Sequence, residues 1–347
     1  MRTDDFSFSL PEELVAQHPP ARRGESRLMV LDRASGERAH ARVDRLVDFI
    51  EPGTLMVFND SRVRKARIYG EALDTGSKTE FLLLRRATGD AWEAVASKIR
   101  RQRPGRRYAF PEGMSAEIIG YSEAEDGNGP DTVIVSFFPS LTEDYLERVG
   151  HVPLPPYIRR EDTREDDERY QTIYSRELGS AACPTAGLHF TEDILASLDA
   201  KGIRRANVTL HVGLGTFLPV RTENIEGHAM HEEEYSVPDL TVRRVMEAKA
   251  EGRPILAVGT TSLRTLESAW VQGEGLRAGR GSTRIFIYPG YRFNAIDALF
   301  TNFHTPKSTL LMLVSAFAER ETILDAYAEA VRERYRFFSY GDAMLIR

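Results

Sequence analysis

Histidines that could transfer protons are concentrated in the second half of this sequence. Five of the eight lie beyond residue 180, and most of them stand beside glycine, small polar or acidic residues: His189, His211, His228, His231 and His304. Because imidazole titrates near neutral pH, it is the side chain best suited to accept or donate protons there. We therefore expect the reaction centre in this half of the chain.

His189 ends a run of small side chains that begins at Gly179. Small residues let backbone amides approach a ligand closely. Thr191 is placed to cap a helix whose first turn holds Glu192 and Asp193. The segment fits a ligand-binding turn with His189 at its mouth, and equally a tight structural loop before a capped helix.

His211 stands near the end of an apolar segment, residues 208–212, that we interpret as a strand. The loop that follows contains Gly213, Gly215 and Thr216. It lacks the third glycine of a dinucleotide fingerprint, and Pro219 forbids an immediate helix, so the pattern argues against NAD binding. A strand-end histidine beside close backbone suits a ligand site, although His211 taken alone is more typical of a structural strand residue.

A strand followed by a polar turn and a helix is predicted at residues 255–267. The turn consists of Gly259, Thr260, Thr261 and Ser262. The helix start is an anion receptor, to which Arg264 could add charge. Because the P-loop lysine is missing, the pattern favours a carboxylate or a ribose over a triphosphate. An ordinary capped turn is the alternative.

His304 and Lys307 lie in a polar loop, residues 301–309, that precedes the apolar helix predicted at 310–317. A helix that is apolar nearly all round must be buried. Polar groups at its head need partners, and a bound substrate or a carboxylate would supply them. We expect this loop and the turns described above to meet in one pocket.

Two further segments have competing interpretations. His228 and His231, followed by three glutamates, permit a metal site, but no recognised ligand pattern is complete, so we expect a hydrogen-bonded histidine and glutamate pair and no metal. Aromatic residues between Tyr335 and Asp342 suit packing on an adenine or a sulfonium, or plain core packing.

Composition describes an ordinary globular protein of two domains. The chain has 347 residues, is 41% hydrophobic and carries a net charge of -6. The single cysteine, Cys183, excludes an intramolecular disulfide and cysteine-rich metal sites. With no signal peptide and no apolar run long enough to cross a bilayer, we expect a cytoplasmic protein without membrane contacts.

Basic residues nevertheless cluster in two places. One cluster comprises Lys98, Arg100, Arg101, Arg103, Arg106 and Arg107, and the other comprises Arg62, Arg64, Lys65 and Arg67. Such clusters suit RNA phosphates, and the net negative charge does not exclude them because charges act over roughly 10 Å. Basic surface loops without a ligand are also common.

The element pattern predicts an α/β fold in two parts. Strands at residues 27–32 and 54–58 flank a helix-like segment around Val43 and Ile50, as in a parallel strand, helix, strand unit. Short strands then run from 66 to 149, and alternation of strands and helices resumes beyond 170, with a further strand at 285–288 and helices from 310 and 323. The acidic run at 161–168 is interpreted as a solvated loop.

We therefore predict a discontinuous α/β sandwich domain, residues 1–65 and 151–347, with an inserted antiparallel β-barrel domain, residues 66–150. The proline-rich segment 151–158 is the expected return linker.

Taken together, the motifs resemble the S-adenosylmethionine:tRNA ribosyltransferase-isomerase family across essentially the whole chain. They are FNDSRV at 58–63, LPPYI at 154–158, ERYQT at 168–172, PTAGLHFT at 184–191, TLHVGLGTF at 209–217, VGTTS at 258–262, TNFH at 301–304, PKST at 306–309 and RFFSYGD at 336–342. The chain departs from the family pattern at Arg64 and Lys65 (expected Ile-Pro), Cys183 (alanine), Ser282 (tryptophan) and Thr305 (leucine).

The resemblance implies that the ribosyl part of S-adenosylmethionine is transferred to 7-aminomethyl-7-deazaguanine at the tRNA wobble position. Epoxyqueuosine, adenine and methionine are the implied products, and S-adenosylmethionine is consumed as a substrate. This chemistry needs a base for a ribose C5' proton, an acid for departing adenine and a free amine as nucleophile.

On this basis we assign roles to single residues. His189 and His211 are the hypothesised proton-transfer pair, with Asp60 or Asp342 orienting or deprotonating. The S-adenosylmethionine site comprises Gly213, Gly215, Thr216, Gly259, Thr260, Thr261 and Ser262, with Arg264 or Lys307 on the carboxylate. The tRNA site comprises Arg62, Lys98, Arg100, Arg101 and His304. We expect a monomer.

Two other functions stay open from the sequence. The basic clusters would suffice for a non-catalytic tRNA-binding protein. A metal hydrolase centred on His228 and His231 would lose activity with a chelator.

Overall fold

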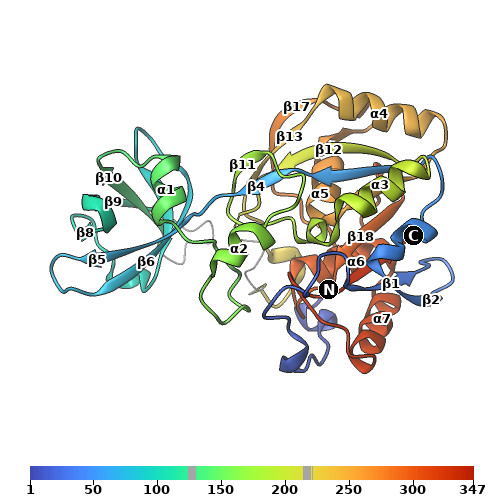
Figure 1. The fold of residues 1–347 in the computed structure, drawn as a ribbon, viewed down its shortest axis with the longest axis horizontal. Coiled ribbons are helices and arrows are strands. Elements are labelled where there is room, and N and C mark those ends of the chain that lie inside the picture. The colour runs from blue at the N-terminus through green and yellow to red at the C-terminus, as the bar shows by residue number, and fades with distance from the viewer. Residues whose placement is uncertain (124–129, 214–219, 221) are drawn as a thin grey trace.

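The computed structural model describes residues 1–123, 130–213, 220 and 222–347. Figure 1 shows a large α/β part and a smaller β-barrel that stands to one side of it. The α/β part is made from both ends of the chain, and the barrel is inserted between them. The predicted fold class is confirmed.

A nine-stranded sheet forms the centre of the α/β part, in the order β17-β13-β12-β3-β14-β18-β19-β1-β2. Its strands are β1 (Arg27–Leu31), β2 (Arg38–Arg42), β3 (Leu55–Asn59), β12 (Arg204–Leu210), β13 (Glu233–Val237), β14 (Ile255–Val258), β17 (Gly279–Thr283), β18 (Ala298–Asn302) and β19 (Ala343–Ile346). The central strands β12, β3, β14 and β18 are parallel to one another. Every residue of β3, β14 and β18 is buried, as expected for parallel strands covered on both faces.

Helices cover both faces of this sheet because alternate strand residues point to opposite sides. Leu55 and Val57 pack in one core with α4 (Asp239–Ala250), α5 (Gly259–Ala269), α6 (Thr309–Ala318) and α7 (Arg320–Arg332). Met56 and Phe58 pack in the other with α3 (Glu192–Ala200) and the 3₁₀ helix η3 (Val43–Phe49). Within the described ranges, no helix is long and apolar enough to cross a membrane.

The smaller part is a closed barrel of six antiparallel strands in the order β10-β7-β6-β5-β8-β9. They are β5 (Arg67–Ala72), β6 (Lys78–Arg86), β7 (Trp92–Ala96), β8 (Arg107–Ala109), β9 (Ser115–Glu123) and β10 (Pro130–Phe138). Phe81, Trp92 and Tyr108 fill the barrel interior, and Leu146 of helix α1 (Glu143–Val149) packs on the same core. These elements fall inside residues 66–150, although the exact domain limits stay a prediction.

The predicted strand, helix, strand unit at the N-terminus is wrong. β1 pairs with β2 and β19, and β19, β18 and β14 separate it from β3. Because β18 and β19 are antiparallel, β1 also runs opposite to β3. β2 is an edge strand with no buried residue, so its sequence lacks the apolar signal of a strand. The intervening helix is one short 3₁₀ segment.

Two smaller predictions also need correction. Residues 285–288 form no strand, and their side chains pack against the core from a loop. The acidic run contains helix α2 (Arg164–Arg169), and Asp166 in its first turn is buried rather than solvated.

Short elements connect the two parts. Strand β4 (Ser61–Val63) leads toward the barrel and pairs with β11 (Glu177–Ser180) of the α/β part. Arg64 then forms an ion pair with Glu143 of α1, 2.8 Å apart. Lys65 pairs with Asp167 of α2 at 2.7 Å. Two of the residues that depart from the expected family pattern therefore form ion pairs at this junction.

Candidate active site

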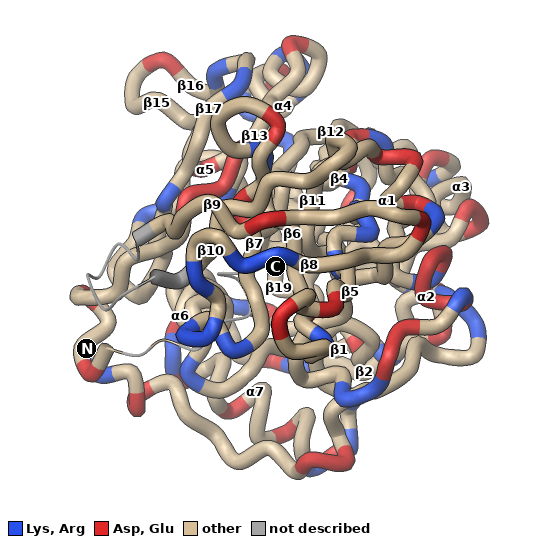
Figure 2. The backbone as a smooth tube through the Cα atoms, turned by 90° about the vertical axis from the view of Figure 1, so that its left-hand side faces the viewer, with Lys and Arg blue, Asp and Glu red and all other residues tan. Residues whose placement is uncertain are grey.

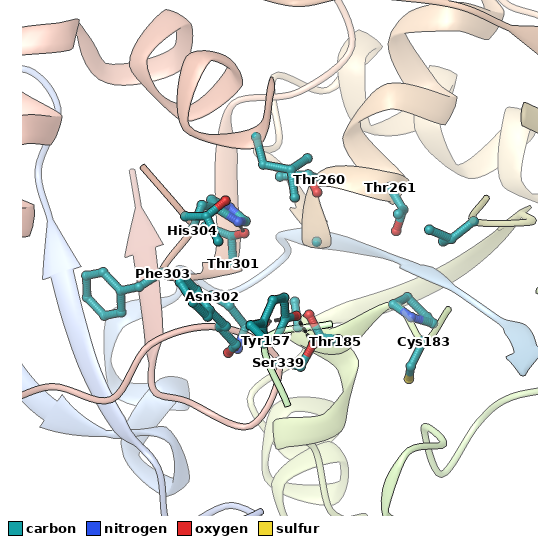
Figure 3. A pocket seen from close by; sticks show the side chains of 17 residues that line it. Tyr157, Cys183, Thr185, Thr260, Thr261, Thr301, Asn302, Phe303, His304 and Ser339 are labelled. Atoms are coloured by element: carbon teal, nitrogen blue, oxygen red, sulfur yellow. Dashed lines mark hydrogen bonds between the residues drawn. The ribbon is translucent and has the colours of Figure 1, made fainter. Parts of the chain in front are cut away.

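A cavity that is partly open to solvent lies at the C-terminal ends of β14 and β18 (Figure 3). Parallel strands present these ends at one edge of the sheet, where α/β proteins bind ligands. The lining residues are Tyr157, Cys183, Pro184, Thr185, Ala186, Val212, Gly259, Thr260, Thr261, Thr301, Asn302, Phe303, His304, Thr305, Leu310, Phe338 and Ser339. The prediction that separate polar turns meet in one pocket is confirmed for three of them, around Thr185, Gly259 and His304.

The turn between β14 and α5 provides one wall of this cavity. Gly259 has a φ of 86°, a conformation that favours glycine, and it begins the helix immediately after the strand. Thr260 and Thr261 follow it along the cavity wall. The Ser262 hydroxyl instead donates to the Val258 carbonyl at 2.8 Å and is fully buried, so Ser262 does not face the cavity.

Asn302, the last residue of β18, joins the opposite walls. Its Nδ2 donates to His189 Nε2 at 3.0 Å and to the Phe338 carbonyl at 3.2 Å. Its Oδ1 accepts from the Thr185 hydroxyl at 3.0 Å. One amide therefore fixes Thr185 and Phe338, which both line the cavity.

His189 lies behind this wall and does not line the cavity. Only 4% of it is exposed, and burial lowers its pKa to about 3, with charge on Arg336 and Arg23 acting in the same direction. Its ring is therefore neutral, and its Nε2 accepts from Asn302. The prediction that His189 stands at the mouth of the site is wrong, because the ring packs against Phe300 of the sheet.

Of the histidines predicted to transfer protons or to contact tRNA, His304 lines the cavity. Its Nε2 lies 3.0 Å from the Thr301 hydroxyl, and its backbone N–H donates to the Tyr327 hydroxyl at 3.0 Å. Burial lowers its pKa to about 3. It was predicted to contact tRNA, but the structure buries it in the pocket rather than on an exposed RNA-binding surface.

His211 and Asp60 lie together beside the cavity. A side chain at Gly179 would meet the His211 ring at 3.0 Å, so glycine is needed there. Asp60 Oδ1 accepts from the Thr209 hydroxyl at 2.7 Å, and burial raises the pKa of Asp60 while lowering that of His211. Neither residue lines the cavity, although Val212 next to His211 does.

Asp342 has a structural position. Its two carboxylate oxygens accept from the backbone N–H groups of Arg27 at 2.9 Å and Arg336 at 2.7 Å. Burial raises its pKa, and these hydrogen bonds oppose the shift. The carboxylate joins the start of β1 to the C-terminal loop and does not line the cavity, contrary to its predicted catalytic position.

The two cations predicted to bind the substrate carboxylate are engaged elsewhere. Arg264 is buried in an ion pair with Glu233, whose Oε1 also accepts from the Gly213 N–H at 3.0 Å. Lys307 pairs with Asp4 at 2.7 Å on the surface. Arg264, Lys307 and Gly213 do not line the cavity, and their contacts with the substrate stay a prediction. Gly215 and Thr216 lie outside the described residues.

Sequence reasoning assigned no role to the lining residues Tyr157 and Asn302, whereas Phe338 lies in the aromatic segment predicted to pack on an adenine or a sulfonium, or in the core. Tyr157 packs against Phe338 in a tilted arrangement, with ring centroids 4.6 Å apart, and its hydroxyl lies 2.6 Å from the Ser339 hydroxyl. Phe338 has a φ of 73°, a strained conformation for a bulky residue that often marks a functional position. Tyr157 and Phe338 both lie within family motifs. The position of Asn302 at the end of a strand could have identified it as a lining residue. Tyr335 and Phe337 are core residues instead.

Cys183 contributes to the wall as an uncharged side chain. It is buried, and burial raises the pKa of its thiol. This agrees with the expectation that the cysteine, standing where the family has alanine, is not a nucleophile.

The predicted RNA-binding cations lie away from the cavity lining. Lys98, Arg100, Arg101 and Arg103 are exposed on the connection between β7 and β8, which lies against β10 (Figure 2). In the described part of the chain these four form no ion pair, whereas Arg106 pairs with Asp74 and Arg107 with Glu117. Arg62 is exposed on β4 at the junction of the two parts.

His228 packs edge-on against Phe286. Among the described residues, no group of three or more His, Cys, Asp or Glu side chains is arranged to hold a metal ion.

The chain is thus an α/β protein with a glycine- and hydroxyl-lined cavity at the ends of parallel strands, the kind of place where such proteins bind small molecules. Residues 3–346 match the family model described as queuosine biosynthesis protein. The S-adenosylmethionine:tRNA ribosyltransferase-isomerases of Treponema denticola and Acetivibrio thermocellus are 51% and 50% identical to the chain, over 100% of both sequences in each case.

A solved structure agrees with these sequence matches. The crystal structure of S-adenosylmethionine tRNA ribosyltransferase from Thermotoga maritima is 36% identical and has a TM-score of 0.56, covering 99% of this chain and 100% of that one. The chain belongs to the queuosine biosynthesis protein family and is an enzyme of the ribosyltransferase-isomerase class.

Proposed function

We propose that the enzyme transfers and isomerises the ribosyl moiety of S-adenosylmethionine onto 7-aminomethyl-7-deazaguanine at the tRNA wobble position. The products are epoxyqueuosine in tRNA, adenine and methionine, and S-adenosylmethionine is consumed. The observation that carries the proposal is the convergence of three family motifs, around Thr185, Gly259 and His304, on one cavity.

The lining chemistry suits a nucleoside with a sulfonium centre. Tyr157 and Phe338 offer aromatic faces to an adenine or a cation. Hydroxyl and amide groups of Thr185, Thr301 and Asn302 suit a ribose.

We propose His304 as the proton-transfer group of this cavity, in place of His189. A neutral imidazole can accept a proton from the ribose C5' carbon, which the adjacent sulfonium acidifies. Thr301 would orient the ring through its contact with Nε2. His189 is assigned a positioning role, because it acts through Asn302.

The barrel cations are the proposed tRNA contacts. Lys98, Arg100 and Arg101 are exposed, and no described carboxylate pairs with them, so phosphates can bind there without breaking an ion pair. A tRNA substrate places the reaction in the cytoplasm, and we propose that the enzyme acts as a monomer.

Adenine release tests the proposal. The enzyme is incubated with S-adenosylmethionine and tRNA that carries the aminomethyl precursor, and adenine, methionine and the modified nucleoside are measured by chromatography. We expect one of each per turnover and none with tRNA that lacks the precursor base.

Two outcomes would contradict the proposal. Tight tRNA binding without adenine release would identify a non-catalytic tRNA-binding protein. Activity abolished by EDTA and restored by a metal ion would indicate metal-dependent chemistry, for which His228 and His231 would be the first residues to substitute.

A further inference from the structure

The methionine part of the proposed substrate carries a carboxylate that needs a receptor. No Lys, Arg, Asp or Glu is found among the lining residues that the structure describes. Arg264 lies outside the lining and pairs with Glu233 through Nη1, while its buried Nε and Nη2 have no hydrogen-bond partner among the described residues; Lys307 pairs with Asp4. The described lining residues therefore include no cationic side chain that could receive the carboxylate.

The first turn of α5 supplies one instead. The first backbone N–H groups of a helix have no partner inside the helix, and the helix dipole favours an anion beside them. No side chain caps α5. Within the described ranges, the N–H groups of Gly259, Thr260 and Thr261 donate to no backbone group outside the helix.

Thr261 provides a second, independent observation. Its Oγ1 is buried and has no hydrogen-bond partner among the described residues, and only 7% of the residue is exposed. An unsatisfied buried hydroxyl is costly. In Figure 3 this hydroxyl points from the start of α5 into the space between the helix and Cys183. A ligand oxygen in that space would satisfy it.

We infer that the start of α5 and the Thr261 hydroxyl form the receptor for the α-carboxylate of S-adenosylmethionine. The inference rests on the proposed function and specifies which part of the cavity holds the methionine end. The adenosine end is then left to the wall formed by Tyr157, Phe338 and His304.

Isothermal titration without tRNA, so that no turnover occurs, tests the inference. The probes are S-adenosylmethionine and its decarboxylated form, which keeps the amine and the sulfonium but lacks the carboxylate. Thr261→Val removes the hydroxyl and keeps the side-chain shape. Thr265→Val is the matched control, because Thr265 is buried one turn later in α5, bonds the Thr261 carbonyl at 2.9 Å and does not line the cavity.

We expect Thr261→Val to weaken S-adenosylmethionine binding about tenfold, as for a lost hydrogen bond to a charged group, and to leave binding of the decarboxylated probe unchanged. Thr265→Val should change neither affinity. In the adenine-release assay, KM for S-adenosylmethionine should rise with little change in kcat, as for uniform binding. Thermal melting of each variant checks that it is folded.

Other results separate the two proposals. Equal loss of affinity for both probes, or a raised KM for tRNA alone, would overturn the carboxylate assignment and would indicate a structural role or an RNA phosphate. If adenine release is normal in that case, the proposed function survives. If the unaltered enzyme neither binds S-adenosylmethionine nor releases adenine, both proposals fail.

Discussion

His189 and His304 show how burial separates two histidines that look alike in sequence. Each lies in a family motif beside small or polar residues. The structure places His189 behind Asn302 and His304 on the cavity wall. Only a ring that reaches the cavity can transfer a proton to a bound substrate, so residue type alone could not choose between them.

The buried, neutral state of His304 predicts a pH-dependent stability. Its pKa is lowered from 6.5 to about 3 by burial, so below pH 6.5 the unfolded chain binds a proton that the folded chain does not. The free energy of unfolding therefore decreases as pH falls, and the contribution of this group to that decrease approaches about 1.4 kcal/mol per pH unit. His304→Gln should lose stability less steeply between pH 7 and 5 in urea unfolding.

The comparison is between slopes, because the substitution also changes stability at neutral pH. His18→Gln is the matched control, since His18 is an exposed histidine that does not line the cavity. Parallel pH profiles for His304→Gln and the unaltered protein would contradict the buried neutral state.

At the scale of elements, helix α2 shows how an acidic segment of the sequence can form stabilising contacts inside the protein. Asp166 accepts hydrogen bonds from Arg160 at 2.6 Å and 2.8 Å and from the Tyr340 hydroxyl at 2.7 Å. Burial alone would raise the pKa of Asp166, but these hydrogen bonds outweigh it and lower the pKa to about 2. The acid thus fastens α2 to the C-terminal motif that contributes Phe338 and Ser339 to the cavity.

Asp166→Asn should destabilise the protein by about 2 kcal/mol, because a charge-assisted network is lost. The carboxylate contributes above its unfolded pKa of 3.8, and that contribution disappears as pH falls toward 2. Urea unfolding at pH 7 measures the loss. Asp167→Asn, in the same helix but exposed, should cost less than about 1 kcal/mol, and equal effects of the two substitutions would contradict the argument.

At the scale of the whole molecule, the cavity and the basic connection of the barrel belong to different parts of the chain (Figure 1). A tRNA that reacts at the cavity and binds the barrel must span both parts. The ion pairs of Arg64 with Glu143 and Lys65 with Asp167 stabilise the junction between them.

Replacing Arg100 and Arg101 together by alanine should weaken tRNA binding uniformly across sequences. The slope of log affinity against log salt should fall by about 2, one for each lost phosphate contact. KM for S-adenosylmethionine should not change. Filter binding over a range of salt concentrations measures both quantities.

Arg107→Ala is the control, because Arg107 pairs with Glu117 and is already neutralised. If the double variant keeps the salt slope of the unaltered enzyme, the connection between β7 and β8 does not contact tRNA.

The sequence by itself determined the family, the fold class, the inserted barrel and the turns that form the cavity. Apolar runs such as residues 255–258 and glycine turns such as Gly259 are local signals, because chain periodicity and backbone sterics depend on neighbouring residues. Edge strand β2 lacks such a signal, and the parallel strand, helix, strand arrangement around η3 was predicted wrongly.

Only the tertiary structure decided which polar residues face the cavity. Asn302, Thr261 and His304 line the cavity. His189, Arg264 and Asp342 do not, and each contacts a residue that is distant in the sequence: Asn302, Glu233 and Arg27, respectively. Such pairings depend on how distant strands and helices pack, and burial then sets each side chain's charge and partners. No spacing within one segment contains that information.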